Sequence, residues 1–117
     1  MRESGILMPV SSLPGPYGIG CFGKAAFQFV DFLSAAGQTI WQLLPLSPTG
    51  YGDSPYQSCS AFAGNPYFVD LETLEKEGLL TAADLKAKSW GKNPLEVDYG
   101  TLYVSRFAVL RKAYAAW

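Results

Sequence analysis

The sequence predicts an α/β fold in which one helix joins two parallel strands. Three successive segments support this prediction: a short apolar run at 5–8, a helical repeat at 23–36 and a second β-type run at 39–44. Strand, helix and strand in this order form the βαβ unit, whose strands are parallel and whose crossover is right-handed. Binding groups in such folds lie beyond the carboxyl ends of the strands. Function is therefore expected in the long loops 9–22 and 45–66.

The first strand is predicted from Gly5-Ile6-Leu7-Met8, an apolar run that Pro9 ends. A short apolar run without polar alternation is typical of a buried strand. Residues 9–20 then read PVSSLPGPYGIG, and this density of proline, glycine and serine predicts a loop.

The helix at 23–36 is predicted from its amphipathic spacing, which gathers four apolar side chains on one face: Ala26, Phe29, Val30 and Leu33. Gly37 follows the last apolar turn, where a C-terminal glycine is expected. The second strand covers residues 39–44, which are β-branched, aromatic and apolar, and it ends at Pro45.

Residues 67–117 are predicted to be rich in helix. One short helix covers 71–77 and ends at Gly78, and a second begins at the capping box of Thr81 and Asp84. The last stretch predicts a strongly amphipathic helix, whose apolar residues recur at helical spacing: Tyr103, Phe107, Leu110, Tyr114 and Trp117. This pattern reaches Trp117 without a glycine stop.

The residue totals exclude several classes of function. Nine basic and ten acidic residues leave a net charge of −1, which offers neither the basic surface that nucleic acids need nor attraction to an anionic membrane. No apolar run is long enough for a secretion signal or a membrane span, so we expect a cytoplasmic protein.

The chain contains no histidine and only two cysteines. A zinc site is therefore not expected, and neither a Ser-His-Asp nor a Cys-His catalyst can be built. We expect no metal and no cofactor. Cys21 and Cys59 are expected to be free, partly buried thiols.

Residues 18–23 match the G-x-G-x-x-G spacing of dinucleotide-binding loops. The context argues against that function, because residues 9–17 separate the glycines from the preceding strand and the second strand ends without an acid for a ribose. We interpret the stretch as a loop whose glycines bring the backbone close to a neighbouring segment.

Residues 50–58, GYGDSPYQS, place two tyrosines and a proline among small hydrogen-bonding side chains. A pyranose sugar has an apolar face and a rim of hydroxyls, which tyrosine rings and Asp, Ser or Gln side chains complement. A phosphate fits less well, because no Arg or Lys lies between Lys24 and Lys76. The residues alone leave two interpretations open: sugar contact, or packing of Tyr51 and Tyr56 onto their own scaffold.

Asp53 is the acidic residue of the two long loops. Chemistry at a glycosidic bond usually requires two carboxylates, about 5 Å apart in retaining enzymes. Because neither loop contains a second acid, we interpret Asp53 as a ligand of substrate or loop and not as a catalyst.

Three stretches resemble the start of the amylomaltases, the 4-α-glucanotransferases also called disproportionating enzymes. These stretches are SGILMPVSSLPGPYGIG, WQLLPLSPTGYGDSPYQS and AFAGNPYFVDLE. The resemblance runs from about Ser4 to Leu80, and LPGPYGIG and SPTGYGDSPYQ are its most specific parts. Ser47 stands where the family more commonly has glycine.

The resemblance implies that residues 1–66 form the first two βα units of a (β/α)₈ TIM-type barrel of the α-amylase kind. Residues 67–117 would form a helix-rich insertion or subdomain after the second strand. The implied reaction transfers α-1,4-glucan segments between maltooligosaccharides by a retaining double displacement through a covalent glucosyl-aspartate.

The motif match also implies residue roles. Ser54 and Tyr56 would line the donor side next to the cleaved bond, with Tyr56 stacked on the sugar ring. Tyr51 would touch glucan at the surface, and Asp53 and Gln57 are included as neighbours in the same motif.

A whole barrel of this type needs about 250 residues. We therefore expect the 117-residue chain to be an N-terminal fragment without transferase activity, because the family's catalytic carboxylates have no counterpart in it. Its expected partners are glucan or maltooligosaccharides and the remaining barrel residues. Two alternatives stay open: a non-catalytic maltooligosaccharide-binding module, and a purely structural α/β fragment whose tyrosines pack inward.

Overall fold

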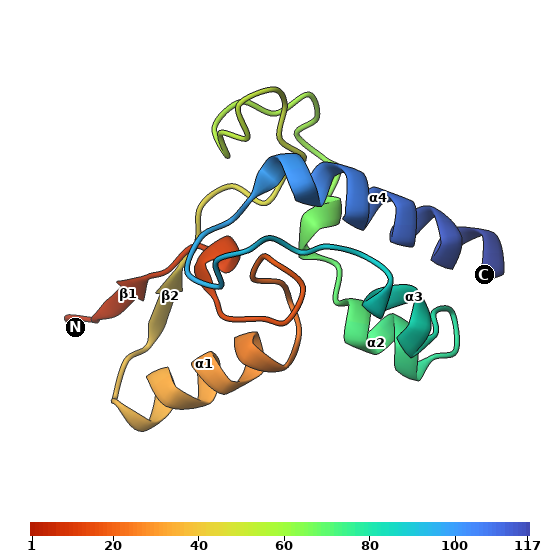
Figure 1. Ribbon diagram of the computed structural model, residues 1–117. Coiled ribbons are helices and arrows are strands. Elements are labelled where there is room, and N and C mark those ends of the chain that lie inside the picture. The colour runs from red at the N-terminus through yellow and green to blue at the C-terminus, as the bar shows by residue number, and fades with distance from the viewer.

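The computed structural model describes residues 1–117 and shows an α/β arrangement in which the predicted strand, helix and strand come first (Figure 1). β1 covers Gly5–Leu7, α1 covers Lys24–Ala35 and β2 covers Ile40–Gln42. The other elements are two 3₁₀ turns and three helices: η1 (Val10–Ser12), η2 (Pro66–Phe68), α2 (Leu71–Lys76), α3 (Ala82–Lys86) and α4 (Tyr99–Ala116).

The two strands are parallel, as predicted, and Gly5 stands opposite Ile40 in the register. Glycine is required there, because a Cβ at Gly5 would lie 2.5 Å from the carbonyl oxygen of Ile40. The prediction of a buried first strand is wrong: Ile6 and Leu7 are 40% and 53% exposed. A sheet of two strands gives its side chains too few neighbours to bury them.

α1 ends as its sequence predicts. Gly37 has a φ of 75°, and the amide of Gln38 donates to the carbonyl of Leu33 at 2.9 Å, which is the longer bond of a Schellman motif. Of the predicted apolar face, Ala26 and Leu33 are buried, whereas Val30 is 48% exposed.

α1 packs on the sheet through an aromatic contact between Phe29 and Trp41, whose ring centroids lie 5.1 Å apart in an edge-to-face arrangement. The indole N–H of Trp41 then donates to the carbonyl of Met8 at 2.9 Å. These contacts hold the carboxyl ends of both strands together, so the two long loops leave the sheet from the same end.

The main core lies away from the sheet. One cluster of buried hydrophobic residues joins α2, α3 and α4, and it consists of Leu71, Leu80, Leu85, Val109 and Ala113. A second cluster of Ile19, Tyr67 and Leu102 joins the loop after β1, η2 and α4. The loop after β1 and the segment after the long loop of β2 therefore both pack against α4.

α4 turns a different face inward from the apolar face that its sequence predicts. The buried residues are Leu102, Ser105, Arg106, Val109 and Ala113. Tyr103, Tyr114 and Trp117, which were predicted on the apolar face, are 67%, 77% and 88% exposed. The other two residues of the predicted face, Phe107 and Leu110, are partly buried and pack against the two hydrophobic clusters.

The short helices begin as predicted. The hydroxyl of Thr81 accepts the amide of Asp84 at 3.2 Å, and the carboxylate of Asp84 accepts the amide of Thr81 at 2.9 Å. Lys112 of α4 pairs with the same carboxylate, which ties α3 to α4. No helix combines the length and the apolar composition that crossing a membrane would require.

The glycine-rich loop at 18–23 brings the backbone close to its neighbours, as predicted. Gly18 has a φ of 80°, and a Cβ there would lie 2.3 Å from the carbonyl oxygen of Trp90. At the start of α1, a Cβ on Gly23 would lie 2.7 Å from a carboxylate oxygen of Asp70. The N-terminus of α1 thus already faces an anion of the chain itself.

Candidate functional site

The loop after β2 folds back on itself as a small hairpin, in which Thr49 and Ser58 form an antiparallel bridge. At the tip of the hairpin, Gly52 and Asp53 have φ values of 89° and 55°. Positive φ is uncommon for a residue other than glycine, and such residues concentrate at functional sites. The hydroxyl of Thr49 donates to Oδ1 of Asp53 at 3.0 Å and holds the aspartate in this conformation.

A groove with a volume of about 660 Å³ lies between this hairpin and α4. Three segments form its walls: the hairpin, the turn η2 and the first half of α4. The lining residues are Pro48, Thr49, Gly50, Tyr51, Gly52, Asp53, Asn65, Pro66, Tyr67, Tyr99, Gly100, Tyr103 and Phe107.

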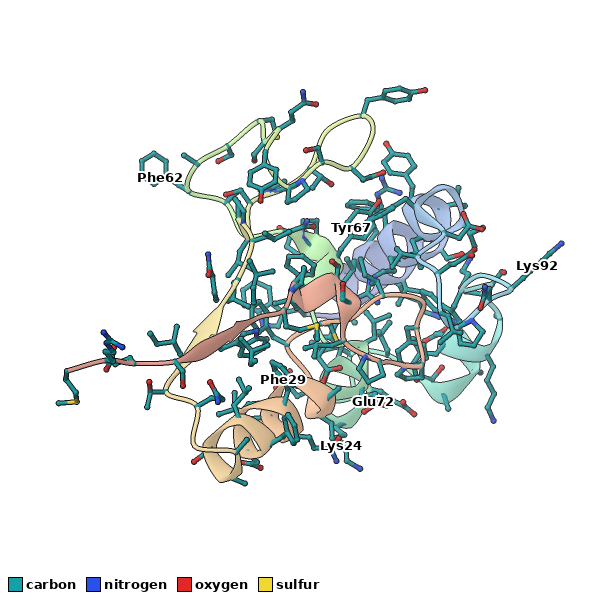
Figure 2. All side chains as sticks on the ribbon, turned by 90° about the vertical axis from the view of Figure 1, so that its left-hand side faces the viewer. Lys24, Phe29, Phe62, Tyr67, Glu72 and Lys92 are labelled. Carbon is teal, nitrogen blue, oxygen red and sulfur yellow. The ribbon has the colours of Figure 1, made fainter.

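Four aromatic rings form a continuous row along the groove. The ring of Tyr67 meets Tyr99 at a centroid distance of 5.6 Å and Phe107 at 5.5 Å. Phe107 in turn meets Tyr103 at 5.4 Å. Figure 2 shows Tyr67 in the interior of the molecule, between the long loop of β2 and α4. The row offers flat apolar faces with phenol hydroxyls at their edges.

The phenols of Tyr67 and Tyr99 stay protonated at neutral pH, because their environment raises the pKa of each. Burial raises the pKa of Tyr67 and of Tyr99, and the nearby carboxylate of Asp53 raises both further. A neutral phenol both donates and accepts hydrogen bonds, so these groups can serve either role toward a ligand hydroxyl.

The structure brings two of the five predicted site residues to the groove. Tyr51 and Asp53 line it, whereas Ser54, Tyr56 and Gln57 lie on the returning half of the hairpin and line no part of it. The hydroxyl of Ser54 accepts the amide of Tyr56 at 3.3 Å, and the backbone carbonyl of Gln57 accepts the amide of Gly50 at 3.2 Å. These three residues thus form a second face of the same loop.

The predicted tyrosines do not pack inward. Tyr51 is fully exposed and Tyr56 is 73% exposed, so packing of their rings onto the scaffold is not seen. Farther along the same loop, Phe62 is also fully exposed, and its ring points away from the body of the molecule (Figure 2).

Sequence reasoning missed the aromatic row of the groove. Tyr67 lies in the stretch AFAGNPYF, whose resemblance to the amylomaltases does not by itself assign Tyr67 to a site. Tyr103 and Phe107 were placed together on one helix face by their spacing, which is the signal that could have found them. The spacing could not show that this face would line a groove.

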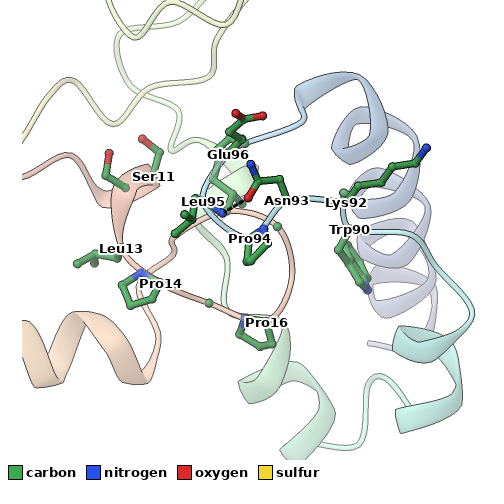
Figure 3. A pocket seen from close by; sticks show the side chains of 16 residues that line it. Ser11, Leu13, Pro14, Pro16, Trp90, Lys92, Asn93, Pro94, Leu95 and Glu96 are labelled. Carbon is green, nitrogen blue, oxygen red and sulfur yellow. Dashed lines mark hydrogen bonds between the residues drawn. The ribbon is translucent and has the colours of Figure 1, made fainter.

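A second hollow of about 410 Å³ lies between the loop 11–19 and the segment 90–97 (Figure 3). Its aromatic side chain is Trp90, whose indole N–H is already bonded to the carbonyl of Leu85 at 3.0 Å. Within the segment, the amide of Leu95 donates to the side chain of Asn93, and Lys92 projects toward solvent (Figure 2). Trp90 also packs edge-to-face against Tyr17, at a centroid distance of 5.2 Å. The groove is the better candidate for binding, because it has several tyrosines and the ring of Tyr51 is fully exposed.

Neither hollow is built to hold a metal, because no group of three or more His, Cys, Asp or Glu side chains is assembled anywhere in the chain. Both cysteines are free, but only Cys21 is partly buried; Cys59 is exposed, against the prediction. The thiol of Cys21 donates to a carboxylate oxygen of Asp70 at 3.6 Å.

Comparison with known proteins gives one consistent result. Residues 8–117 match the family Glyco_hydro_77, described as 4-alpha-glucanotransferase. The chain is 56% identical over 112 residues to the 4-alpha-glucanotransferase of Streptococcus pneumoniae serotype 4, which aligns 96% of this chain with 22% of that protein. It is 50% identical over 113 residues to the 4-alpha-glucanotransferase of Thermus thermophilus, again with 22% of that protein aligned.

The fold has a close counterpart among solved structures. The structure of the amylomaltase from Streptococcus agalactiae in complex with acarbose superimposes with a TM-score of 0.94 at 48% identity. The match covers 99% of this chain and 23% of that one. The chain thus spans about a fifth of the length of the relatives it matches, 22% for the first of them.

Proposed function

The chain belongs to the 4-alpha-glucanotransferase family, and from this premise we propose that it supplies part of the glucan-binding surface of such an enzyme. In the complete enzyme, α-1,4-glucan segments would be transferred between maltooligosaccharides by a retaining double displacement. The observation that carries the proposal is the open groove with its aromatic row, at the end of the sheet where parallel α/β folds bind ligands.

The groove matches a glucan in shape and in chemistry. Each glucose ring of an α-1,4-glucan has an apolar face that can stack on tyrosine and a rim of hydroxyls that needs hydrogen-bonding partners. Tyr51 offers a free ring on one wall, and Asp53 offers a carboxylate oxygen beside it. The neutral phenols of Tyr67 and Tyr99 complete a mixed apolar and polar lining.

The second face of the hairpin has a different role in the proposal. Ser54 and Tyr56 would contact the sugar on the donor side of the cleaved bond, with Gln57 beside them, as the resemblance to the amylomaltases implies. Residues 1–66 would be the first two βα units of a (β/α)₈ barrel, and residues 67–117 a helix-rich insertion. The large exposure of Ile6 and Leu7 supports a sheet that continues in the complete enzyme.

The proposal is tested by titrating the chain with maltoheptaose in a calorimeter, before and after Tyr51→Ala. We expect saturable binding that weakens about ten-fold in the variant, which corresponds to about 1.4 kcal/mol, within the range of one aromatic contact. Tyr114→Ala is the matched control, because Tyr114 is 77% exposed but lies on α4 outside the groove.

Two results would contradict the proposal. One is the absence of saturable binding by the folded chain, and the other is equal weakening by Tyr51→Ala and Tyr114→Ala. A third variant, Tyr56→Ala, separates the groove from the second face of the hairpin. If Tyr51→Ala abolishes binding and Tyr56→Ala leaves it unchanged, the ligand lies in the groove and not on the second face.

A further inference from the structure

One cationic side chain is buried where the two long loops meet α4. Arg106 is 1% exposed and lies on α4 between Leu102 of one hydrophobic cluster and Val109 of the other. Its Nη2 donates to the carbonyl of Val69 at 2.5 Å, and its Nη1 donates to the carbonyl of Tyr17 at 3.4 Å. A single guanidinium therefore bonds to the loop after β1, through Tyr17, and to the segment that follows the long loop of β2, through Val69.

Burying the charged guanidinium of Arg106 costs more free energy than burying a side chain that only fills space. Removing a charge from water without an ion pair is strongly unfavourable, and Arg106 takes part in no ion pair. Its Nε has no hydrogen-bond partner at all, and burial lowers its pKa. An aliphatic side chain would pack in this core at lower cost, so the two carbonyl bonds are what distinguish arginine here.

Those bonds bear directly on the groove. Val69 follows the turn η2, which carries Tyr67, and the ring of Tyr67 lies against Tyr99 and Phe107 of α4. Arg106 precedes Phe107 on the same helix. The bond from Arg106 to Val69 therefore holds η2 on α4 next to the contact between the rings of Tyr67 and Phe107.

We propose that Arg106 is a positioning residue of the groove: its guanidinium clamps the loop after β1 and the segment after the long loop of β2 onto α4, and so keeps the ring of Tyr67 in the aromatic row. The residue would not touch a ligand, because it is buried and does not line the groove. Calling the positioned surface a glucan site rests on the proposed function, whereas the positioning of Tyr67 does not.

Two variants separate positioning from simple packing. Arg106→Lys keeps the charge but replaces two nitrogens held in a planar fork by one ammonium on a flexible stem, which does not hold the two carbonyls in a fixed geometry. Arg106→Met keeps an apolar stem of similar length and removes every donor. Arg111→Met is the matched control, because Arg111 lies exposed on the same helix.

For each variant of the 117-residue chain, two quantities are measured: the dissociation constant for maltoheptaose and the nuclear Overhauser contacts between the rings of Tyr67, Tyr99 and Phe107. We expect both Arg106 variants to lose these ring contacts and to bind about ten-fold more weakly per folded molecule, which is about the loss of one aromatic contact. Arg111→Met should change neither quantity.

Unchanged ring contacts and unchanged affinity in the folded Arg106 variants would overturn the proposal, even if their thermal stability fell. If neither variant folds, the test is made on the unaltered chain. Scalar couplings are then measured between the guanidinium nitrogens of Arg106 and the carbonyl carbons of Tyr17 and Val69. Their presence supports the clamp, and their absence overturns it. If the unaltered chain does not bind maltoheptaose, the proposed function fails while the ring contacts still decide the role of Arg106.

Discussion

At Gly18, the backbone of the loop after β1 lies against the carbonyl of Trp90, in the segment before α4. The φ of Gly18, 80°, lies in the left-handed region, and a Cβ would come within 2.3 Å of the carbonyl oxygen of Trp90. Glycine avoids both the torsional strain and the clash. The glycine spacing that resembles a nucleotide loop is thus explained by backbone packing.

Gly18→Ala is expected to lower the free energy of unfolding by at least about 2 kcal/mol, because strain and a backbone clash add. The measurement is urea unfolding followed by tryptophan fluorescence. Gly64→Ala is the control, since Gly64 has no positive φ and its Cβ would meet nothing within 4 Å. Equal effects of the two substitutions would refute this explanation.

The two cysteines are expected to react at very different rates. Burial, with a further contribution from Asp70, raises the pKa of Cys21 from 9.0 to about 11, whereas Cys59 is exposed. Because the thiolate is the reactive form, iodoacetamide at about pH 8 should modify Cys59 quickly and Cys21 slowly. Mass spectrometry of Cys21→Ser and Cys59→Ser assigns the two rates, and equal rates would contradict the burial argument.

The raised pKa of Cys21 also gives a sign for the pH dependence of stability. The folded state holds the thiol proton of Cys21 more tightly than the unfolded state does. The contribution of this proton to the free energy of unfolding is therefore complete below pH 9.0 and is lost as the pH rises toward 11. Cys21→Ser should reduce this alkaline loss.

The sequence predicted individual residues of the groove where their chemical groups lie close together along the chain. Tyr51 and Asp53 were singled out because ring and carboxylate lie in one loop, and both line the groove. Tyr67 and Tyr99 could not be singled out in this way, because segments far apart in the chain bring them together. The prediction that Ser54, Tyr56 and Gln57 bind substrate stays a prediction.

Helix α3 shows how much a cap contributes to a short element. It has five residues, too few for a helix to persist in water on its own propensity. Thr81 and Asp84 satisfy each other's backbone amides, and Lys112 pairs with Asp84 from α4. Capping and one long-range ion pair thus hold the element in place.

Thr81→Ala is expected to lower the free energy of unfolding by about 1 kcal/mol, the usual value of an N-cap hydroxyl. Ser89→Ala is the control, because Ser89 is exposed and lies after the helix. Chemical unfolding measures both, and a loss in the control as large as that in Thr81→Ala would contradict the capping argument.

The capping box also has a pH signature. The hydrogen bond from Lys112, followed by the bonds from Thr81, lowers the pKa of Asp84 from 3.8 to about 2. The pKa of Asp84 is thus lower in the folded state than in the unfolded state. The ionised carboxylate therefore stabilises the fold above pH 3.8, and this stabilisation disappears as the pH falls toward 2. Asp84→Asn should remove this part of the acid dependence.

The local sequence predicted which strands and helices form, but it did not always predict which of their side chains are buried. Both strands and α1 form at the predicted positions, because apolar runs, helical spacing and a C-terminal glycine are encoded within each segment. The burial of β1 and the inward face of α4 were predicted wrongly. Both depend on which segments pack against the element, and spacing alone does not specify that.

Across the whole molecule, the sheet and the core are separate. The hydrophobic clusters join loops and helices to α4, while the two strands remain partly exposed. The groove lies on the clustered part, because Tyr67 belongs to the second cluster and Tyr99 and Phe107 pack against it. Figure 1 shows this division, with the two-stranded sheet at one end and α4 at the other.

The chain alone is expected to show no transferase activity. Asp53 is the carboxylate in the groove, and transfer through a covalent glycosyl intermediate requires two carboxylates about 5 Å apart. Incubation with maltotriose, followed by chromatography for glucose and longer glucans, measures the activity. The 4-alpha-glucanotransferase of Thermus thermophilus is a suitable positive control, and clear turnover by the chain would refute the expectation.

The sequence by itself determined the parallel βαβ unit, the helix caps, the absence of histidine chemistry and the loop that carries Tyr51 and Asp53. Each of these follows from residues that are neighbours along the chain, so spacing and composition suffice. Only the tertiary structure decided that Tyr99, Tyr103 and Phe107 of α4 line a groove together with Tyr67. It also decided that Arg106 joins the loop after β1 to the segment after the long loop of β2. These features depend on contacts between distant segments, which form because apolar surface is buried collectively and not residue by residue.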